Sequence, residues 1–353
     1  MEFGMFLEFP VREGGTEKEA FDDSLLLVNE AEQLGVDSLW LAEYHFNPGR
    51  VLASPITICA NIAARTERIR LGTAVVLLPL ANPVRVAEEI ATLDLISGGR
   101  VEFGIGRGTF PNVHEGFNSP FAESRGRFEE SLEIILKAWT NETFSFEGEH
   151  YNLKDLTVTP KPFQKPHPPV RVGVTSAASF PTTGRMGYDI LINPSRVFTL
   201  AGLKPQIEEY HQAWKDAGHA GEPTTVVRIP TLLADTSEEA ERLSDELMVL
   251  ARKYFSGRQG IGSTDAGSAS PETTAEVNLF GTAEEVVETI DIEHFSDLIK
   301  NPGALLSRTR LVNDFAKLAT GAGYPACFSM NKRDTQMPLM APGFFVASAN
   351  MFM

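Results

Sequence analysis

The stretch RLGTAVVLLPLANPVRVAEEIATLDLISGGRVEFGIGRG, residues 70–108, decides the fold. The runs 69–78 and 101–106, near its two ends, are short, β-branched and apolar, which is typical of buried strands. The segment 83–96 between them has helical spacing and begins with a proline, and Gly98 and Gly99 end it. A strand, a helix and a second strand in succession predict a parallel β-α-β unit.

The same alternation continues along most of the chain. Further strands are predicted at 3–9, 37–42, 170–174, 189–193, 226–233 and 292–299, which brings the total to eight. Helices are predicted at 17–34, 55–66, 122–139, 177–186, 199–217, 237–254, 281–290 and 303–318. Gly35 is expected to end the first helix and Ser54 to cap the second. The pattern predicts an α/β fold, a (β/α)8 TIM barrel with insertions.

We expect one barrel domain over residues 1–320, followed by an extension of unknown structure over 321–353. Within the domain, residues 143–169 break the alternation with a turn-like Glu-Gly-Glu and clustered prolines, so an inserted hairpin and loop are predicted there. Residues 256–274 are rich in Gly, Ser and Thr, which predicts a mobile loop.

Composition excludes several classes of function. Of the 353 residues, 47 are acidic and 31 basic, and the net charge of −16 disfavours nucleic acid and anionic membrane surfaces as partners. The first residues carry no basic, apolar leader, so a cytoplasmic location is expected. The two cysteines, Cys59 and Cys327, are too few for a disulfide framework or a cysteine metal site, and we expect both to be buried.

In an eight-stranded barrel the functional residues gather after the carboxyl ends of the strands. Arg107 follows one predicted strand beside Gly106, and its planar guanidinium suits a phosphate group. Ser176 and Ser179 follow another strand at a helix start, where N–H groups favour an anion. These residues predict a phosphate site. The alternative is that Ser176 only caps its helix and Arg107 pairs with a surface carboxylate.

His45 follows the second predicted strand and lies close in sequence to Glu43. Histidine can give or take a proton near neutral pH, so His45 is the candidate catalytic residue, although a lone histidine can also be structural. The other six histidines show no HxH or HExxH spacing, so no metal site is predicted.

Five stretches resemble the bacterial luciferase-like, flavin-dependent monooxygenase family. They are MEFGMFLEF, GVDSLWLAEYHF, residues 70–108, SRGRFEE and FGTAEEVV, and together they run in order through about residues 1–300. The resemblance implies a barrel enzyme that uses reduced FMN (FMNH2), supplied by a separate flavin reductase, and dioxygen. Such an enzyme oxygenates a small organic substrate through a peroxyflavin. A homodimer, or a heterodimer with a related chain, is also implied.

The resemblance assigns roles to individual positions. His45 would assist the oxygen chemistry, and the flavin phosphate would be held by Arg107, Arg125, Ser176 and Ser179. Ala74 and Val75 match the family's non-proline cis peptide beneath the flavin ring. Two positions depart from luciferase: Gly106 stands where luciferase has a reactive cysteine, and Thr175 where it has an acidic residue before the first serine.

Two alternatives to this function are open. The same barrel family includes dehydrogenases that use the deazaflavin F420. A flavin-binding protein without turnover is the other alternative, because Gly106 and the unfamiliar tail depart from the pattern.

Overall fold

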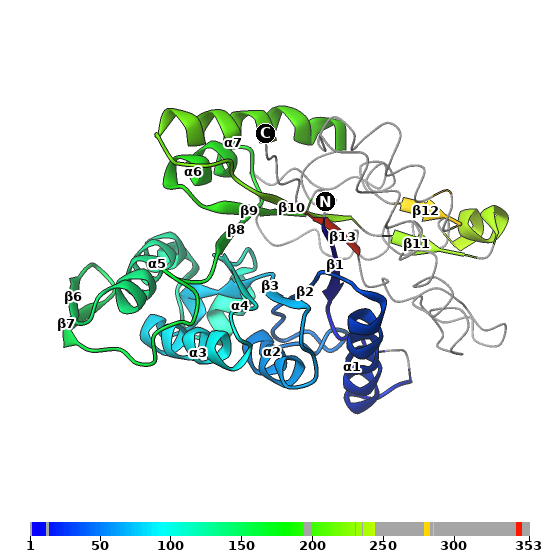
Figure 1. Cartoon of the computed structure of the whole chain (residues 1–353), viewed down its shortest axis with the longest axis horizontal. Coiled ribbons are helices and arrows are strands. Elements are labelled where there is room, and N and C mark those ends of the chain that lie inside the picture. The colour runs from blue at the N-terminus through cyan, green and yellow to red at the C-terminus, as the bar shows by residue number, and fades with distance from the viewer. Residues whose placement is uncertain are drawn as a thin grey trace. The chain divides into compact units, whose positions relative to one another are not determined.

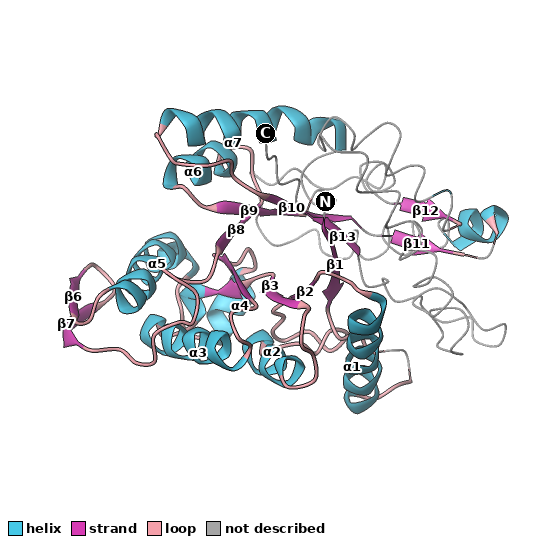
Figure 2. Ribbon diagram, viewed as in Figure 1, coloured by secondary structure: helices cyan, strands magenta, loops and turns pink. Residues whose placement is uncertain are grey.

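The computed structural model describes residues 2–11, 14–193, 200–229, 231–234, 236–243, 279–282, 285 and 344–347. The chain divides into two compact units. Residues 38–173 form one, called here the central unit, and residues 1–37 and 174–353 form the other, called the terminal unit. Figure 1 labels most helices and strands of both units, and Figure 2 distinguishes the helices from the strands.

The central unit alternates strands and helices as the sequence predicts. Its elements are β2 (Ser38–Leu41), α2 (Pro55–Ala63), β3 (Arg70–Thr73), β4 (Val76–Leu77), η1 (Leu78–Leu80), α3 (Pro83–Ile96), β5 (Val101–Gly106), α4 (Pro111–Gly116), η2 (Phe121–Glu123), α5 (Ser124–Thr140), β6 (Phe144–Glu147), β7 (Asn152–Leu156) and β8 (Val170–Val174). Strands β6 and β7 pair as an antiparallel hairpin within the predicted insertion.

The sheet of the central unit is parallel, which confirms the predicted β-α-β units. Strand β2 pairs with β3, β3 with β5, and β5 with β8. Helix α3 packs against both α2 and α5, and the Trp139 indole N–H of α5 donates to the Ala87 carbonyl of α3 (3.0 Å). Gly72 leaves room for the Trp40 ring of the neighbouring strand, because a Cβ there would overlap that ring.

Helix α2 ends three residues before the predicted end at residue 66. The Arg100 guanidinium, which follows α3, donates to the carbonyls of Ala63 (3.0 Å), Thr66 (2.9 Å) and Ile69 (3.0 Å). These bonds satisfy carbonyls that a longer helix would otherwise need to pair. Ser54 stands at the N-cap position, but its side chain makes no capping bond and instead contacts the Thr57 hydroxyl (2.7 Å).

The strand predicted over residues 69–78 is interrupted. Strand β3 ends at Thr73 and β4 begins at Val76, and the Ala74–Val75 peptide bond between them is cis. The buried Thr73 hydroxyl donates to the Gly104 carbonyl (2.7 Å) and accepts from the Gly104 N–H (3.0 Å). Both short strands thereby stay paired with β5.

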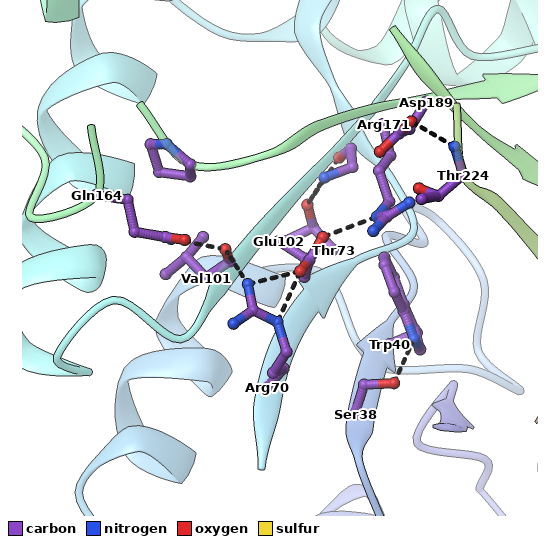
Figure 3. A network of polar contacts seen from close by, with 12 residues as sticks. Ser38, Trp40, Arg70, Thr73, Val101, Glu102, Gln164, Arg171, Asp189 and Thr224 are labelled. Atoms are coloured by element: carbon purple, nitrogen blue, oxygen red, sulfur yellow. Dashed lines mark hydrogen bonds and ion pairs between the residues drawn. The ribbon is translucent and has the colours of Figure 1, made fainter. Parts of the chain in front are cut away.

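A buried ion network joins the amino-terminal ends of three strands. Glu102 of β5 lies between Arg70 of β3 and Arg171 of β8, with N–O distances of 2.6 and 2.7 Å. Figure 3 shows these three side chains beside Trp40, whose ring lies 5.7 Å from the Arg171 guanidinium carbon. Only 8% of the Glu102 side chain is exposed, so its charge depends on the two arginines for compensation.

The terminal unit contains β1 (Glu2–Leu7), α1 (Glu17–Leu34), α6 (Ser179–Met186), β9 (Asp189–Ile192), α7 (Leu200–Asp216), β10 (Thr225–Ile229), β11 (Thr231–Leu233), β12 (Leu279–Gly281) and β13 (Phe344–Ala347). Helix α1 has the predicted bounds, with a capping box between Thr16 and Glu19 and a left-handed Gly35 (φ 85°) after it. Strand β9 is parallel to β10, and α6 packs against α7.

The tail contributes one described strand. Strand β13 lies in the predicted extension and pairs antiparallel with both β1 and β10. The predicted loop 256–274, strand 292–299 and helix 303–318 lie outside the described residues, as does most of the tail. None of the helices in the described ranges combines the length and apolarity that crossing a bilayer requires.

Candidate functional site

His45 and Glu43 form a hydrogen-bonded pair in the loop after β2. The imidazole Nε2 lies 2.7 Å from Glu43 Oε1, and the other carboxylate oxygen, Oε2, accepts the backbone N–H of Leu77 (3.1 Å). The side chains are 13% and 11% exposed, respectively. The carboxylate therefore ties the imidazole to strand β4, which restricts the movement of a candidate proton-transfer group.

Aromatic side chains surround this pair. The Phe117 ring meets His45 edge to face at a centroid distance of 4.7 Å, and Phe46 lies 5.6 Å from Phe117. Phe46 has a left-handed backbone (φ 53°) and 63% of it is exposed. Gly116 makes space for its ring, because a Cβ there would overlap Phe46. An exposed aromatic group next to a half-buried imidazole is suited to contact an apolar ligand.

Arg107 and Arg125 lie close enough to repel each other. Burial lowers the pKa of the Arg107 guanidinium, and the charge of Arg125 lowers it further. Arg107 Nη1 donates to the Ser124 hydroxyl (3.1 Å), and its guanidinium carbon lies 5.3 Å from the centre of the Phe121 ring. Neither arginine forms an ion pair with a carboxylate of the described residues, which is contrary to the alternative that Arg107 pairs with a surface carboxylate.

His114 of α4 packs against the chain that follows β5, at Arg107 and Gly108. His114 is 1% exposed, neither ring nitrogen makes a hydrogen bond of standard geometry in the described chain, and the ring contacts the Arg107 backbone. A Cβ on Gly108, which has a left-handed backbone, would lie 3.0 Å from the His114 Nε2. The ring also meets Phe121 edge to face at 5.1 Å. His114 thus supports both the Arg107–Gly108 turn and the aromatic ring under Arg107.

Val75 and two glycines form a close-packed floor at the carboxyl ends of β5 and β8. A Cβ on Gly106 would overlap Val75 Cγ2, and one on Gly173 would lie 3.3 Å from Val75 Cγ1. The Ala74–Val75 bond is cis, which is the geometry that the resemblance implies at these positions. The branched side chain of Val75 therefore occupies the volume that a side chain at position 106 would need.

Thr175, Ser176 and Ser179 lie in the terminal unit, before and at the start of α6. The Ser179 hydroxyl donates to the Ser176 carbonyl and accepts the Ser176 N–H (3.2 Å). Helix α6 begins at Ser179, its N-cap residue is Ala178, and no side chain caps it. Ser176 is therefore not the helix cap that the alternative interpretation required.

Six of the predicted site residues lie in the central unit, together with Glu43, which is close to His45 in the sequence. Most of them follow the carboxyl end of a strand, Gly106 is the last residue of β5, and Arg125 lies in the first turn of α5; the seven are Glu43, His45, Ala74, Val75, Gly106, Arg107 and Arg125. Sequence reasoning missed Ser124, His114 and Phe117. Ser124 directly precedes Arg125 in SRGRFEE and was the easiest to find; the burial of His114 leaves no signal in the sequence, because α4 was not predicted.

Metal and thiol chemistry gain no support from the described residues. They contain no cluster of three His, Cys, Asp or Glu side chains arranged to hold a metal ion. Cys59 is fully buried in α2, and burial raises the pKa of its thiol to about 12, so it stays protonated and unreactive. Its burial confirms the expectation for this cysteine, whereas Cys327 lies outside the described residues.

Comparison with known families and proteins adds independent information. A family model described as luciferase-like monooxygenase matches residues 1–294. An FMNH2-dependent dimethylsulfone monooxygenase of Pseudomonas putida is 30% identical over 67% of this chain and 69% of its own length. The oxygenase component of a flavin-dependent trigonelline monooxygenase of Acinetobacter baylyi is 24% identical over 82% of this chain and 85% of its own.

Coverage of other relatives is lower. An uncharacterised protein of Sinorhizobium fredii is 36% identical over 50% of this chain, and a second is 33% identical over 46%. The matches cover 52% and 46% of those two proteins, so the chain spans about half the length of these curated relatives.

Solved structures establish the fold. The monooxygenase RslO1 from Streptomyces bottropensis has a TM-score of 0.72 and 27% identity, and the match covers 90% of this chain and 98% of RslO1. An F420-dependent secondary alcohol dehydrogenase has a TM-score of 0.64 and 19% identity over 84% of this chain and 91% of its own. The TIM-barrel prediction is confirmed.

Proposed function

The chain belongs to the luciferase-like monooxygenase family, and we propose that it is the oxygenase component of a two-component system that uses FMNH2 and dioxygen. One oxygen atom enters a small organic substrate and the other leaves as water, with two electrons supplied by the reduced flavin. The names of the dimethylsulfone and trigonelline relatives support this proposal, because one is FMNH2-dependent and the other an oxygenase component.

The observation that carries the proposal is the hydrogen bond from Arg107 to Ser124, the residue before Arg125, which brings Arg107 to the start of α5 where Arg125 stands. Two guanidinium groups that repel each other, and that lack a carboxylate partner in the described chain, are stabilised by an added dianion. A flavin phosphate is such a group. Ser176, Ser179 and Thr175, with the first turn of α6, are the second group of residues that we assign to this phosphate.

The remaining site residues suit the flavin ring and the substrate. The flavin supplies the oxygen-activating chemistry when it is bound. Val75, Ala74 and Gly106 offer an apolar floor for a planar ring, and the rings of Phe46 and Phe117 exclude water near His45. His45 moves a proton in this reaction. A separate reductase that delivers FMNH2 is the partner that we propose.

Reconstitution tests the function. The purified chain receives FMNH2 from an added FMN reductase and NADH in air, together with a panel of small ketones, aldehydes and sulfur compounds. We expect oxygen uptake with an oxygenated product detected by mass spectrometry. A parallel reaction contains reduced F420 instead. Reduction of a ketone or aldehyde by reduced F420 alone would indicate a dehydrogenase, and binding of FMN without any oxygenated product would indicate a flavin-binding protein without monooxygenation.

A further inference from the structure

We propose that Glu43 is a positioning residue that fixes the tautomer of His45, so that Nδ1 is the atom that accepts the proton. The inference rests on the proposed function for its catalytic meaning, but the tautomer itself is a property of the protein alone. His45 would then act through its Nδ1 atom, and Glu43 would be the residue that orients it.

Glu43 can only accept hydrogen bonds in this arrangement. The Leu77 backbone N–H is always a donor, so Glu43 Oε2 must be an acceptor (3.1 Å). An ionised carboxylate offers a second acceptor at Oε1, which lies 2.7 Å from His45 Nε2. The hydrogen in that short contact therefore belongs to the imidazole, and Nε2 is the protonated nitrogen of the neutral ring.

The other ring nitrogen remains available. His45 Nδ1 has no hydrogen-bond partner among the described residues. It is also not one of the buried side-chain nitrogens that lack a partner, a group whose imidazole members both belong to His114. Nδ1 of His45 is therefore accessible. The edge-to-face contact with Phe117 at 4.7 Å holds the plane of the ring. An accessible lone pair on a held ring is the geometry that a proton acceptor needs.

The Glu43→Gln variant reverses this arrangement with little change in shape. The Leu77 N–H still requires an oxygen, so the glutamine carbonyl takes that place and its NH2 group faces His45 Nε2. An NH2 group donates, which forces Nε2 to accept and moves the ring proton to Nδ1. The carboxylate-to-amide change in a serine protease triad has this consequence and lowers turnover roughly 10⁴-fold.

Nuclear magnetic resonance of ¹⁵N-histidine-labelled full-length protein tests the tautomer directly. His45→Gln identifies the His45 signals among those of the seven histidines. At a pH where the ring is neutral, we expect the wild-type protein to show the Nε2–H tautomer and Glu43→Gln to show the Nδ1–H tautomer. A wild-type Nδ1–H tautomer would overturn the proposal, and this measurement decides it even if the variant does not fold.

Turnover supplies the functional test. Product formed per FMNH2 should fall at least about 10²-fold in Glu43→Gln, while the dissociation constant for FMNH2 stays within a factor of about 2. The matched control is Glu129→Gln, an exposed position on α5, which should change neither. Full turnover by a variant with the reversed tautomer would overturn the catalytic role. A wild-type protein without oxygenase activity but with the Nε2–H tautomer would contradict only the proposed function.

Discussion

The two ends of strand β5 carry charge in opposite ways. At the amino-terminal end, Glu102 is buried between Arg70 and Arg171, and its carboxylate forms ion pairs with both guanidinium groups. After the carboxyl end, Arg107 lies near Arg125, and no described carboxylate compensates them. The carboxylate at one end has cationic partners within the protein, whereas the two guanidinium groups at the other end have no anionic partner among the described residues.

This difference separates stability from binding along one strand. In barrels, the amino-terminal face serves stability and the carboxyl-terminal loops carry function. Removal of a charge should therefore destabilise the protein at the Glu102 end, and should weaken a ligand complex at the Arg107 end. Variants at both ends of the strand test that separation.

Glu102→Gln should cause the largest loss of stability. It leaves the guanidinium groups of Arg70 and Arg171 without their shared anion, and breaking a buried ion pair costs about 3–5 kcal/mol. Urea unfolding measures the change in the free energy of unfolding. The exposed Glu129→Gln variant should change it by less than about 0.5 kcal/mol. A loss below about 1 kcal/mol for Glu102→Gln would show that the network does not stabilise this end.

Arg107→Ala and Arg125→Ala should affect binding instead. Loss of a charge-assisted hydrogen bond of about 1.5–3 kcal/mol raises the dissociation constant for reduced FMN roughly 10- to 150-fold. The free energy of unfolding should stay within about 0.5 kcal/mol, because relief of repulsion offsets lost contacts. Anaerobic titration measures the affinity.

Riboflavin, which lacks the phosphate, is the control ligand for these two variants. Its affinity should be unchanged in both, and the exposed Arg65→Ala variant should bind FMN normally. Equal losses for riboflavin and FMN would mean that the arginines do not hold the phosphate.

Gly106→Ala tests the floor of the site. The new methyl group overlaps Val75 Cγ2, and such overpacking costs about 1–3 kcal/mol. Val75→Ala in the same chain should relieve the overlap, with a coupling energy of about 1 kcal/mol or more in a double-mutant cycle. Gly173→Ala should cost less, because its Cβ would lie 3.3 Å from Val75. Additive effects of Gly106→Ala and Val75→Ala would contradict the shared volume.

Local sequence patterns predicted most of the central fold, and their limits are equally physical. The bounds of α3, β5 and β8 match the predicted ones. The signals that set these bounds are local, because the hydrophobic period, Pro83 and Gly98 affect only the few residues around them. The interruption between β3 and β4 was missed, since an apolar run does not show where a chain leaves its strand. Helix α4 was missed as well, because six residues are too few to show a helical period.

The site was only partly predictable for a related reason. Arg125 entered through resemblance, and its proximity to Arg107 depends on how α5 starts after η2. Glu102 was not singled out, because register alone brings it beside Arg70 and Arg171. Spacing along the chain predicts which residues follow a strand, but contacts between strands require the register of the sheet.

His114→Phe should give the smallest effect, and one that depends on pH. Burial lowers the pKa of His114; contact with the Arg107 backbone opposes the shift, and the Arg107 charge adds to it. The unfolded chain, with a histidine pKa of about 6.5, takes up a proton more readily than the folded protein. The stability that the neutral ring provides is therefore present above about pH 6.5 and decreases as pH falls towards the folded pKa.

Phenylalanine has a similar volume and no ring nitrogen to leave without a partner, so at about pH 8 the variant should remain within about 1.5 kcal/mol of wild type. Below about pH 6.5 it should lose less stability than wild type. Urea unfolding at about pH 8 and pH 5.5 measures both quantities. Parallel pH profiles would mean that His114 protonates equally in both states, and the ring under Gly108 would then be open to water rather than packed beneath the turn.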